Sequence, residues 1–180
     1  PGRLPDRKHK KRWTAFDTAL ISIGQGDILV SPLQAAVYTA AIATNGTLWR
    51  PNILKTIVAP GGAAVYSEHA QATGHLAASP QTLEIIRKGM YLSVNSDIGG
   101  SKRARNGVID LSGKTGTAEV GPRSTRYKNT WFTGFGTHNG KTYAIAILVE
   151  HGVSGGKTCA PLAAEFFNRW LGDGKETVSR

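Results

Sequence analysis

Three stretches of the chain place apolar residues at helical spacing. Residues 31–45 follow a helix-start signal, Ser31-Pro32-Leu33-Gln34, in which a serine can cap, a proline suits the first turn and a glutamine completes a capping box. Ser79-Pro80 opens a second helix, and a third is predicted from Pro161 to Gly172. The positions expected to face inward are Leu33, Val37, Ala40, Ala41, Leu83, Ile86, Met90, Tyr91, Leu162, Phe166, Phe167, Trp170 and Leu171.

Three later stretches have the apolar and β-branched character of strands. The first runs from Val108 through residue 118, and the second covers residues 127–137. Asn139-Gly140 then predicts a tight hairpin joining Thr130–Thr137 to Thr142–Val149, because this dipeptide suits a two-residue turn between strands. The return strand is apolar enough to be buried on both faces.

The remaining stretches give weaker signals. Residues 49–58 predict one short strand, residues 59–78 a loop or a poorly ordered hairpin, and residues 152–158 a loop. Gly24-Gln25-Gly26 predicts a turn near the functional site. Helices, then three sequential antiparallel strands, then a helix indicate an α+β fold, an antiparallel sheet flanked by helices.

Charged residues are unevenly distributed along the chain. It carries 22 Lys and Arg against 12 Asp and Glu, a net charge of +10, and residues 1–12 hold six basic residues and one acidic residue. We expect a basic extended segment over residues 1–14, a folded part over 15–172 and a polar tail over 173–180. The run at residues 7–12 is typical of a solvated loop, of a nucleic-acid patch or of a segment near an anionic envelope polymer. No aromatic residue interleaves with it to stack on bases, which disfavours nucleic acid as a partner.

The cysteine, apolar and histidine content limits the kinds of site that the chain can form. Cys159 is the single cysteine, so no intrachain disulfide can form, and no apolar run approaches the roughly 18 residues of a membrane helix. Two histidines six positions apart on a predicted loop, His69 and His75, do not make a metal site without a set of carboxylate or thiolate partners. We expect no metal and no cofactor. A first residue of proline suggests a fragment of a longer protein.

The sequence Gly113-Lys114-Thr115-Gly116-Thr117 offers the clearest candidate chemistry. An ammonium and two hydroxyls on one strand can hold a carboxylate, while a backbone N–H points at a reacting carbonyl. Side chains alternate along a strand, so residues 114 and 116 share one face and 115 and 117 share the other. The strand should therefore border a cleft, so that groups from both of its faces reach one ligand. An ordinary solvated strand is the alternative.

The surrounding motifs resemble those of class B penicillin-binding proteins. Lys-Thr-Gly is the third motif of serine enzymes that recognise penicillin. The resemblance extends from Gly2 to Leu171 and is strongest to the penicillin-binding protein 2, cell-elongation type. It rests also on Gly2-Arg3-Leu4-Pro5, Ile23-Gly24-Gln25-Gly26, Val30-Ser31-Pro32-Leu33-Gln34, Asn45-Gly46 with Arg50-Pro51 (one glycine short of the family pattern), Trp131-Phe132-Thr133-Gly134-Phe135 and Ala160-Pro161.

The resemblance implies the C-terminal part of a transpeptidase domain of the penicillin-binding and β-lactamase-like type, and serine acyl transfer as its reaction. Lys114 would polarise the site and attract a substrate carboxylate, and the hydroxyls of Thr115 and Thr117 would bind that carboxylate. The backbone N–H of Thr117 would form half of the oxyanion hole. Gly116 would let substrate lie along the strand.

The nucleophilic serine and its lysine base are expected upstream and are not found. Ser154-Gly155-Gly156-Lys157 has the letters of Ser-x-x-Lys but follows the Lys-Thr-Gly motif, so we interpret it as coincidence. Ser93-Val94-Asn95 lies at a helix end and too close to Lys114 for the family order. The fragment alone is therefore predicted to be inactive.

Partners and location follow from the same resemblance. It implies peptidoglycan stem peptides and β-lactam antibiotics as ligands, a membrane glycan polymerase and cell-elongation proteins as partners, and no nucleic acid. The location implied is the periplasmic face of the bacterial inner membrane, with the anchor outside this chain. Two alternatives are a relative that hydrolyses or senses β-lactams, and a non-enzymatic binding module driven by the basic residues at 7–12 and 102–105.

Overall fold

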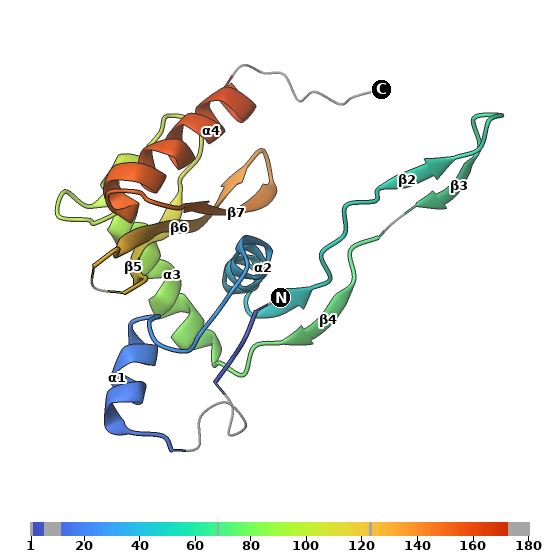
Figure 1. Ribbon diagram of the computed structural model, residues 1–180. Coiled ribbons are helices and arrows are strands. Elements are labelled where there is room, and N and C mark those ends of the chain that lie inside the picture. Colours follow the sequence, from blue (N-terminus) through green and yellow to red (C-terminus); the bar gives the residue numbers. More distant parts are fainter. Residues whose placement is uncertain (1, 6–11, 68, 123, 173–180) are drawn as a thin grey trace.

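A three-stranded antiparallel sheet forms the centre of the computed structural model, which describes residues 2–5, 12–67, 69–122 and 124–172. Its strands are β5 (Ser112–Val120), β6 (Tyr127–His138) and β7 (Lys141–Val149), in the order β5-β6-β7 (Figure 1). Helices lie on both faces, so the α+β prediction is confirmed.

The predicted hairpin is present with the expected turn. Thr130 pairs with Val149 and Thr137 with Thr142, so β6 and β7 are in register along the full length of β7. Asn139 has φ 49° and Gly140 has φ 73°, the left-handed conformations that a two-residue turn between twisted strands requires.

Helices α2 (Pro32–Ala43) and α4 (Ala160–Gly172) cover opposite faces of the sheet (Figure 1). The capping box of α2 is formed as predicted: Gln34 N–H donates to Ser31 Oγ at 3.2 Å, and Ser31 N–H donates to Gln34 Oε1 at 2.9 Å. The main core lies between the α4 face of the sheet and the helices, and its buried members are Val94, Ala104, Ile109, Leu111, Phe132, Cys159, Ala160, Ala163 and Phe167.

Helix α3 (Pro80–Asn95) buries a narrower stripe than predicted. Leu83 and Met90 are buried, whereas Ile86 and Tyr91 are 39% and 45% exposed. Positions 83, 90 and 94 follow one line along the helix, and positions 86 and 91 flank it. The prediction that these side chains face inward was therefore wrong for Ile86 and Tyr91. It was also wrong for Leu33 in the first turn of α2, which is 60% exposed.

The predicted burial of β7 and α4 also needs correction. Residues 143–149 of β7 are half-buried and not enclosed on both faces, because β7 is an outer strand of a narrow sheet. On α4, Phe167 is buried, but Leu162, Phe166 and Trp170 are 40–45% exposed, since three strands cannot cover the whole apolar face. A π-helical turn, η2 (Gly155–Cys159), precedes α4 in part of the stretch predicted as a loop.

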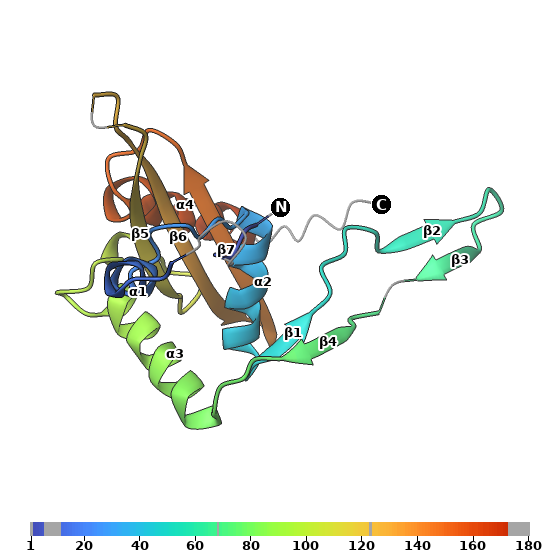
Figure 2. The same ribbon diagram turned by 60° about the horizontal axis from the view of Figure 1, so that its bottom comes forward.

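Residues 47–67 and 69–75 form a two-part hairpin arm that projects away from the sheet (Figures 1 and 2). Its outer pair, β2 with β3, is exposed at every residue. The prediction of one strand over residues 49–58 was wrong, because β1 ends at Trp49 and β2 begins at Thr56. The four strands of the arm are β1 (Thr47–Trp49), β2 (Thr56–Val58), β3 (Ala64–Ser67) and β4 (Ala72–His75).

Besides η2, two further short elements were not predicted. Helix α1 (Ala15–Ser22) begins with a capping box between Thr14 and Asp17, a signal present in the sequence, and a 3₁₀ turn, η1 (Lys102–Ala104), follows α3. Most of the basic run, residues 7–11, and the expected tail, residues 173–180, lie outside the described residues. Within those residues, every helix falls short of the length and apolar character needed to cross a membrane.

Candidate active site

All four candidate residues, Lys114 through Thr117, line one cleft. The cleft has a volume of about 640 Å³ and lies between β5, the α1–α2 loop and the start of α2. Its other lining residues include Gly24, Gln25, Tyr38 and Trp131. The turn predicted at residues 24–26 therefore borders the site as expected.

The cleft runs along the free edge of β5. Within the described part of the chain, β5 pairs with β6 alone, in a register that matches Lys114 with Thr133 and Thr117 with Thr130. The prediction that this strand borders the cleft is thus confirmed. An edge strand exposes the backbone groups of every second residue.

Hydrogen bonds from side chains show which residues of β5 have their backbone groups at the free edge. Three carbonyls on β5 and just before it accept from side chains: Leu111 from Asn95 Nδ2 at 3.0 Å, Thr115 from Lys114 Nζ at 2.7 Å and Thr117 from Gln25 Nε2 at 3.3 Å. The three acceptors are odd-numbered, so the N–H and C=O of Thr115 and Thr117 point out of the sheet toward the cleft.

The side chains divide between the two faces as alternation requires. Lys114 is exposed on the α2 face, where it also borders a second hollow of about 520 Å³ between α2, α3 and the sheet. Gly116 shares this face, and a Cβ there would meet only Trp131 Cβ, at 3.4 Å, so the strand is open above it. A flat ligand can therefore lie along this part of β5.

Thr115 and Thr117 have their hydroxyls on the other face, where each has a partner. Thr115 Oγ1 accepts from Ser101 Oγ at 3.5 Å, and Ser101 Oγ in turn accepts from Ser93 Oγ at 2.9 Å. Thr117 Oγ1 accepts from the backbone N–H of Gly155 at 3.1 Å. A hydroxyl that accepts one hydrogen bond can still donate its own proton, so Thr117 retains a donor for an anion.

The turn at Gly155 supports β5 from behind. A Cβ on Gly155 would lie 2.5 Å from the backbone oxygens of both Gly116 and Trp131, so only glycine fits there. Sequence reasoning missed this contact, although the adjacent glycines 155 and 156 were a signal of close packing. Ser154 caps the turn by accepting from Lys157 N–H at 3.2 Å. That Ser93 and Ser154 are not nucleophiles remains a prediction.

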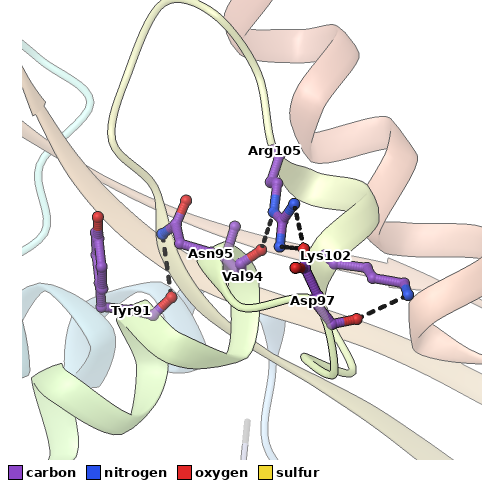
Figure 3. A network of polar contacts seen from close by, with 6 residues as sticks. All are labelled: Tyr91, Val94, Asn95, Asp97, Lys102 and Arg105. Carbon is purple, nitrogen blue, oxygen red and sulfur yellow. Dashed lines mark hydrogen bonds and ion pairs between the residues drawn. The ribbon is translucent and has the colours of Figure 1, made fainter.

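The basic residues after α3 have local structural partners (Figure 3). Arg105 donates to Val94 O at 2.8 Å and forms an ion pair with Asp97 at 3.3 Å. Lys102 Nζ donates to Asp97 O at 2.9 Å. These cations hold the loop that leads into β5, which weakens the case for a basic binding surface at residues 102–105. The part of the chain that the structure describes contains no His, Cys, Asp and Glu cluster suited to a metal ion.

Residues 3–168 match the family described as the penicillin binding protein transpeptidase domain. The chain belongs to this family. The resemblance to class B penicillin-binding proteins of the penicillin-binding protein 2 type is thereby confirmed, since relatives and solved structures of that type match nearly the whole chain.

Three similar proteins illustrate the relationship. The peptidoglycan D,D-transpeptidase MrdA of Haemophilus influenzae is 26% identical over 180 residues, which cover 92% of this chain and 27% of that protein. Helicobacter pylori PBP2, solved in complex with MreC, is 32% identical with a TM-score of 0.72, over 94% of this chain and 30% of that one. Penicillin-binding protein A of Mycobacterium tuberculosis, solved as an imipenem acyl-enzyme, is 28% identical with a TM-score of 0.68, over 84% of this chain and 33% of that one. This chain thus spans about a third or less of each relative.

Proposed function

We propose that this chain is the part of a peptidoglycan D,D-transpeptidase that holds and polarises the substrate. The whole protein would cross-link stem peptides by serine acyl transfer and would be acylated by β-lactams. The observation that carries the proposal is the free edge of β5, where Lys114 through Thr117 line the cleft. The relatives' names support it, since the H. influenzae protein is a D,D-transpeptidase and the M. tuberculosis protein forms an acyl-enzyme.

Each residue of the strand has a distinct role in this proposal. The Lys114 ammonium attracts the substrate carboxylate, and the Thr117 hydroxyl, which accepts from Gly155 N–H, donates to it. The backbone N–H of Thr117 points out of the sheet edge and stabilises negative charge on the reacting carbonyl oxygen. Thr115 supports the strand from its rear face through Ser101 and is a weaker candidate for direct contact with substrate.

The covalent step uses a serine and a lysine that we place outside these 180 residues. The serine oxygen bonds to the substrate carbonyl carbon, the carbon–nitrogen bond breaks, and the serine proton passes through the lysine to the departing nitrogen. An amine of a second stem peptide then attacks the ester, and its proton returns to the serine oxygen. In a β-lactam the departing nitrogen stays attached through the ring.

Partners and location are part of the same proposal. The H. pylori relative was solved with MreC, which supports cell-elongation proteins as partners of the whole protein. Cross-linking requires glycan strands that carry stem peptides, so we include a membrane glycan polymerase. The reaction belongs in the bacterial envelope, on the periplasmic side of the inner membrane.

A longer protein that contains the whole domain tests the function. It should react with a fluorescent penicillin to give one covalent adduct per molecule, which peptide mass spectrometry should locate on a serine outside residues 1–180. Absence of an adduct would contradict the proposal. An adduct on Ser93 or Ser154 would keep β-lactam acylation but overturn the assignment of the nucleophile.

A further inference from the structure

Gln25, which is distant from β5 in the sequence, contacts the free edge of that strand. Its side-chain amide donates from Nε2 to the Thr117 carbonyl at 3.3 Å, and both residues line the cleft. Gln25 is half-buried, whereas the residues on either side of it are exposed. Both neighbours are glycines, so Gln25 supplies the only side chain of the turn at residues 24–26.

The backbone holds Gln25 in this position. Gln25 N–H donates to Leu20 O at 2.9 Å, and Gly24 N–H donates to Ile21 O at 3.0 Å, so the turn closes directly on the end of α1. Gly24 and Gly26 have φ values of 73° and 80°, a conformation that favours glycine. The side chain is thus presented by an ordered turn on the end of a helix.

The Thr117 carbonyl is the acceptor that a bound acyl group would need. The N–H and C=O of Thr117 point the same way, out of the edge of β5. In an antiparallel pair, two opposed residues exchange both of their hydrogen bonds. A ligand unit whose carbonyl accepts from Thr117 N–H therefore donates its own amide N–H to Thr117 O. This step rests on the proposed function, in which Thr117 N–H forms part of the oxyanion hole.

We propose that Gln25 is a specificity-determining residue that occupies the position of the ligand's amide N–H. A ligand with an amide N–H beside its reacting carbonyl must displace the Gln25 amide from Thr117 O. A ligand without that N–H can enter and leave the Gln25 contact intact. Gln25 therefore lowers reactivity toward the first class relative to the second, and it excludes water from Thr117 O when the cleft is empty.

Two β-lactams separate these classes. Penicillin G carries an acylamino group on the carbon next to the β-lactam carbonyl, and imipenem carries a hydroxyethyl group there. The longer protein with the whole domain is compared with its Gln25→Met variant, which keeps the side-chain length but removes the donor, and with Gln25→Ala. Gln81→Met, the same change on the exposed start of α3, is the matched control.

Both Gln25 variants should be acylated by penicillin G about threefold to tenfold faster, as loss of one competing hydrogen bond predicts, with imipenem changed less than about twofold. Gln81→Met should change neither rate. An equal change with both antibiotics, or slower acylation by penicillin G in either variant, would overturn the inference. If the unaltered protein reacts with neither antibiotic, the proposed function itself fails, and that result is distinct from an unchanged ratio between the two rates.

Discussion

At the scale of single residues, Thr117 has polar groups that reach both the free edge and the rear face of β5. Its carbonyl accepts from Gln25, and its hydroxyl accepts from Gly155 N–H on the other face of the strand. Its backbone N–H shares the outward direction of its carbonyl. The Lys114 side chain is exposed on the α2 face, and its ammonium donates to Thr115 O at 2.7 Å. Separate hydrogen bonds hold the two residues, and both can therefore bind one carboxylate.

Replacing Lys114 tests the electrostatic part of the site. In the longer protein, Lys114→Ala should slow acylation by a fluorescent penicillin on the order of a hundredfold, because a principal charge contact to the carboxylate is lost. Stopped-flow or gel-based labelling rates give the measurement. Lys88→Ala, on the exposed surface of α3, should retain the original rate. A rate for Lys114→Ala within threefold of the original would remove Lys114 from the site.

Replacing Gly155 tests the support behind the strand. The added methyl group of Gly155→Ala would lie 2.5 Å from two backbone oxygens, of Gly116 and Trp131, so β5 must shift. We expect a loss of about 1–3 kcal/mol in the free energy of unfolding, measured by urea denaturation, together with slower acylation. Gly107→Ala is the control, because a Cβ there meets no atom within 4 Å. Unchanged stability in Gly155→Ala would contradict the close packing.

At the scale of elements, β5 is an edge strand with side-chain donors on two of its outward carbonyls, Thr115 and Thr117, and on the Leu111 carbonyl just before it. Asn95, Lys114 and Gln25 each donate to one outward carbonyl, which limits pairing with an unrelated strand while the edge stays open to a ligand. The opposite edge, β7, belongs to a hairpin that its own turn holds in register. Strands β2, β3 and β4 of the hairpin arm are exposed at every residue, so they are less buried than either edge strand.

Amide hydrogen exchange in the longer protein should follow the pairing and burial of these strands. The amides of β6 should exchange slowest, because the strand is paired on both sides. On β7, amides that point to β6, at Tyr143, Ile145 and Ile147, should exchange more slowly than those of Ala144 and Ala146. The exposed pair β2 and β3 should exchange fastest among the strands. Uniformly rapid exchange from residue 143 to 148 would refute the hairpin.

At the scale of the whole molecule, the chain exposes apolar surface around the cleft that we propose as the binding part of an active site. Tyr38 and Ile86 are each about 40% exposed beside the hollow between α2, α3 and the sheet. This chain covers 27% of the H. influenzae relative, so most of such a protein lies outside these residues. On the proposed function, binding and catalysis would depend on how the rest of the domain completes the cleft.

The 180-residue chain alone should not be labelled by a fluorescent penicillin. On the proposed function, it supplies a strand that binds the substrate carboxylate and one oxyanion donor, and these contacts cannot form a stable acyl-enzyme without a nucleophile. Intact-mass spectrometry after incubation with the penicillin should show the unmodified mass. A stoichiometric adduct on this chain would mean that one of its own serines is the nucleophile.

Local signals in the sequence determined much of the fold. The capping box at Ser31, the hairpin turn at Asn139-Gly140 and the Lys-Thr-Gly strand all depend on residues within a few positions of one another, so their geometry can be predicted from the sequence. Alternation along β5 likewise assigned Lys114 to one face and Thr117 to the other.

Tertiary structure alone decided what surrounds that strand. Gln25 lies 92 positions from Thr117 and Gly155 lies 38 positions from it, and no local pattern relates residues so far apart. The burial of Ile86, β7 and α4 was overestimated for the same reason, because exposure depends on how wide the sheet is and on which elements reach it. Hydrogen bonds and burial depend on proximity in space, which folding creates between distant segments.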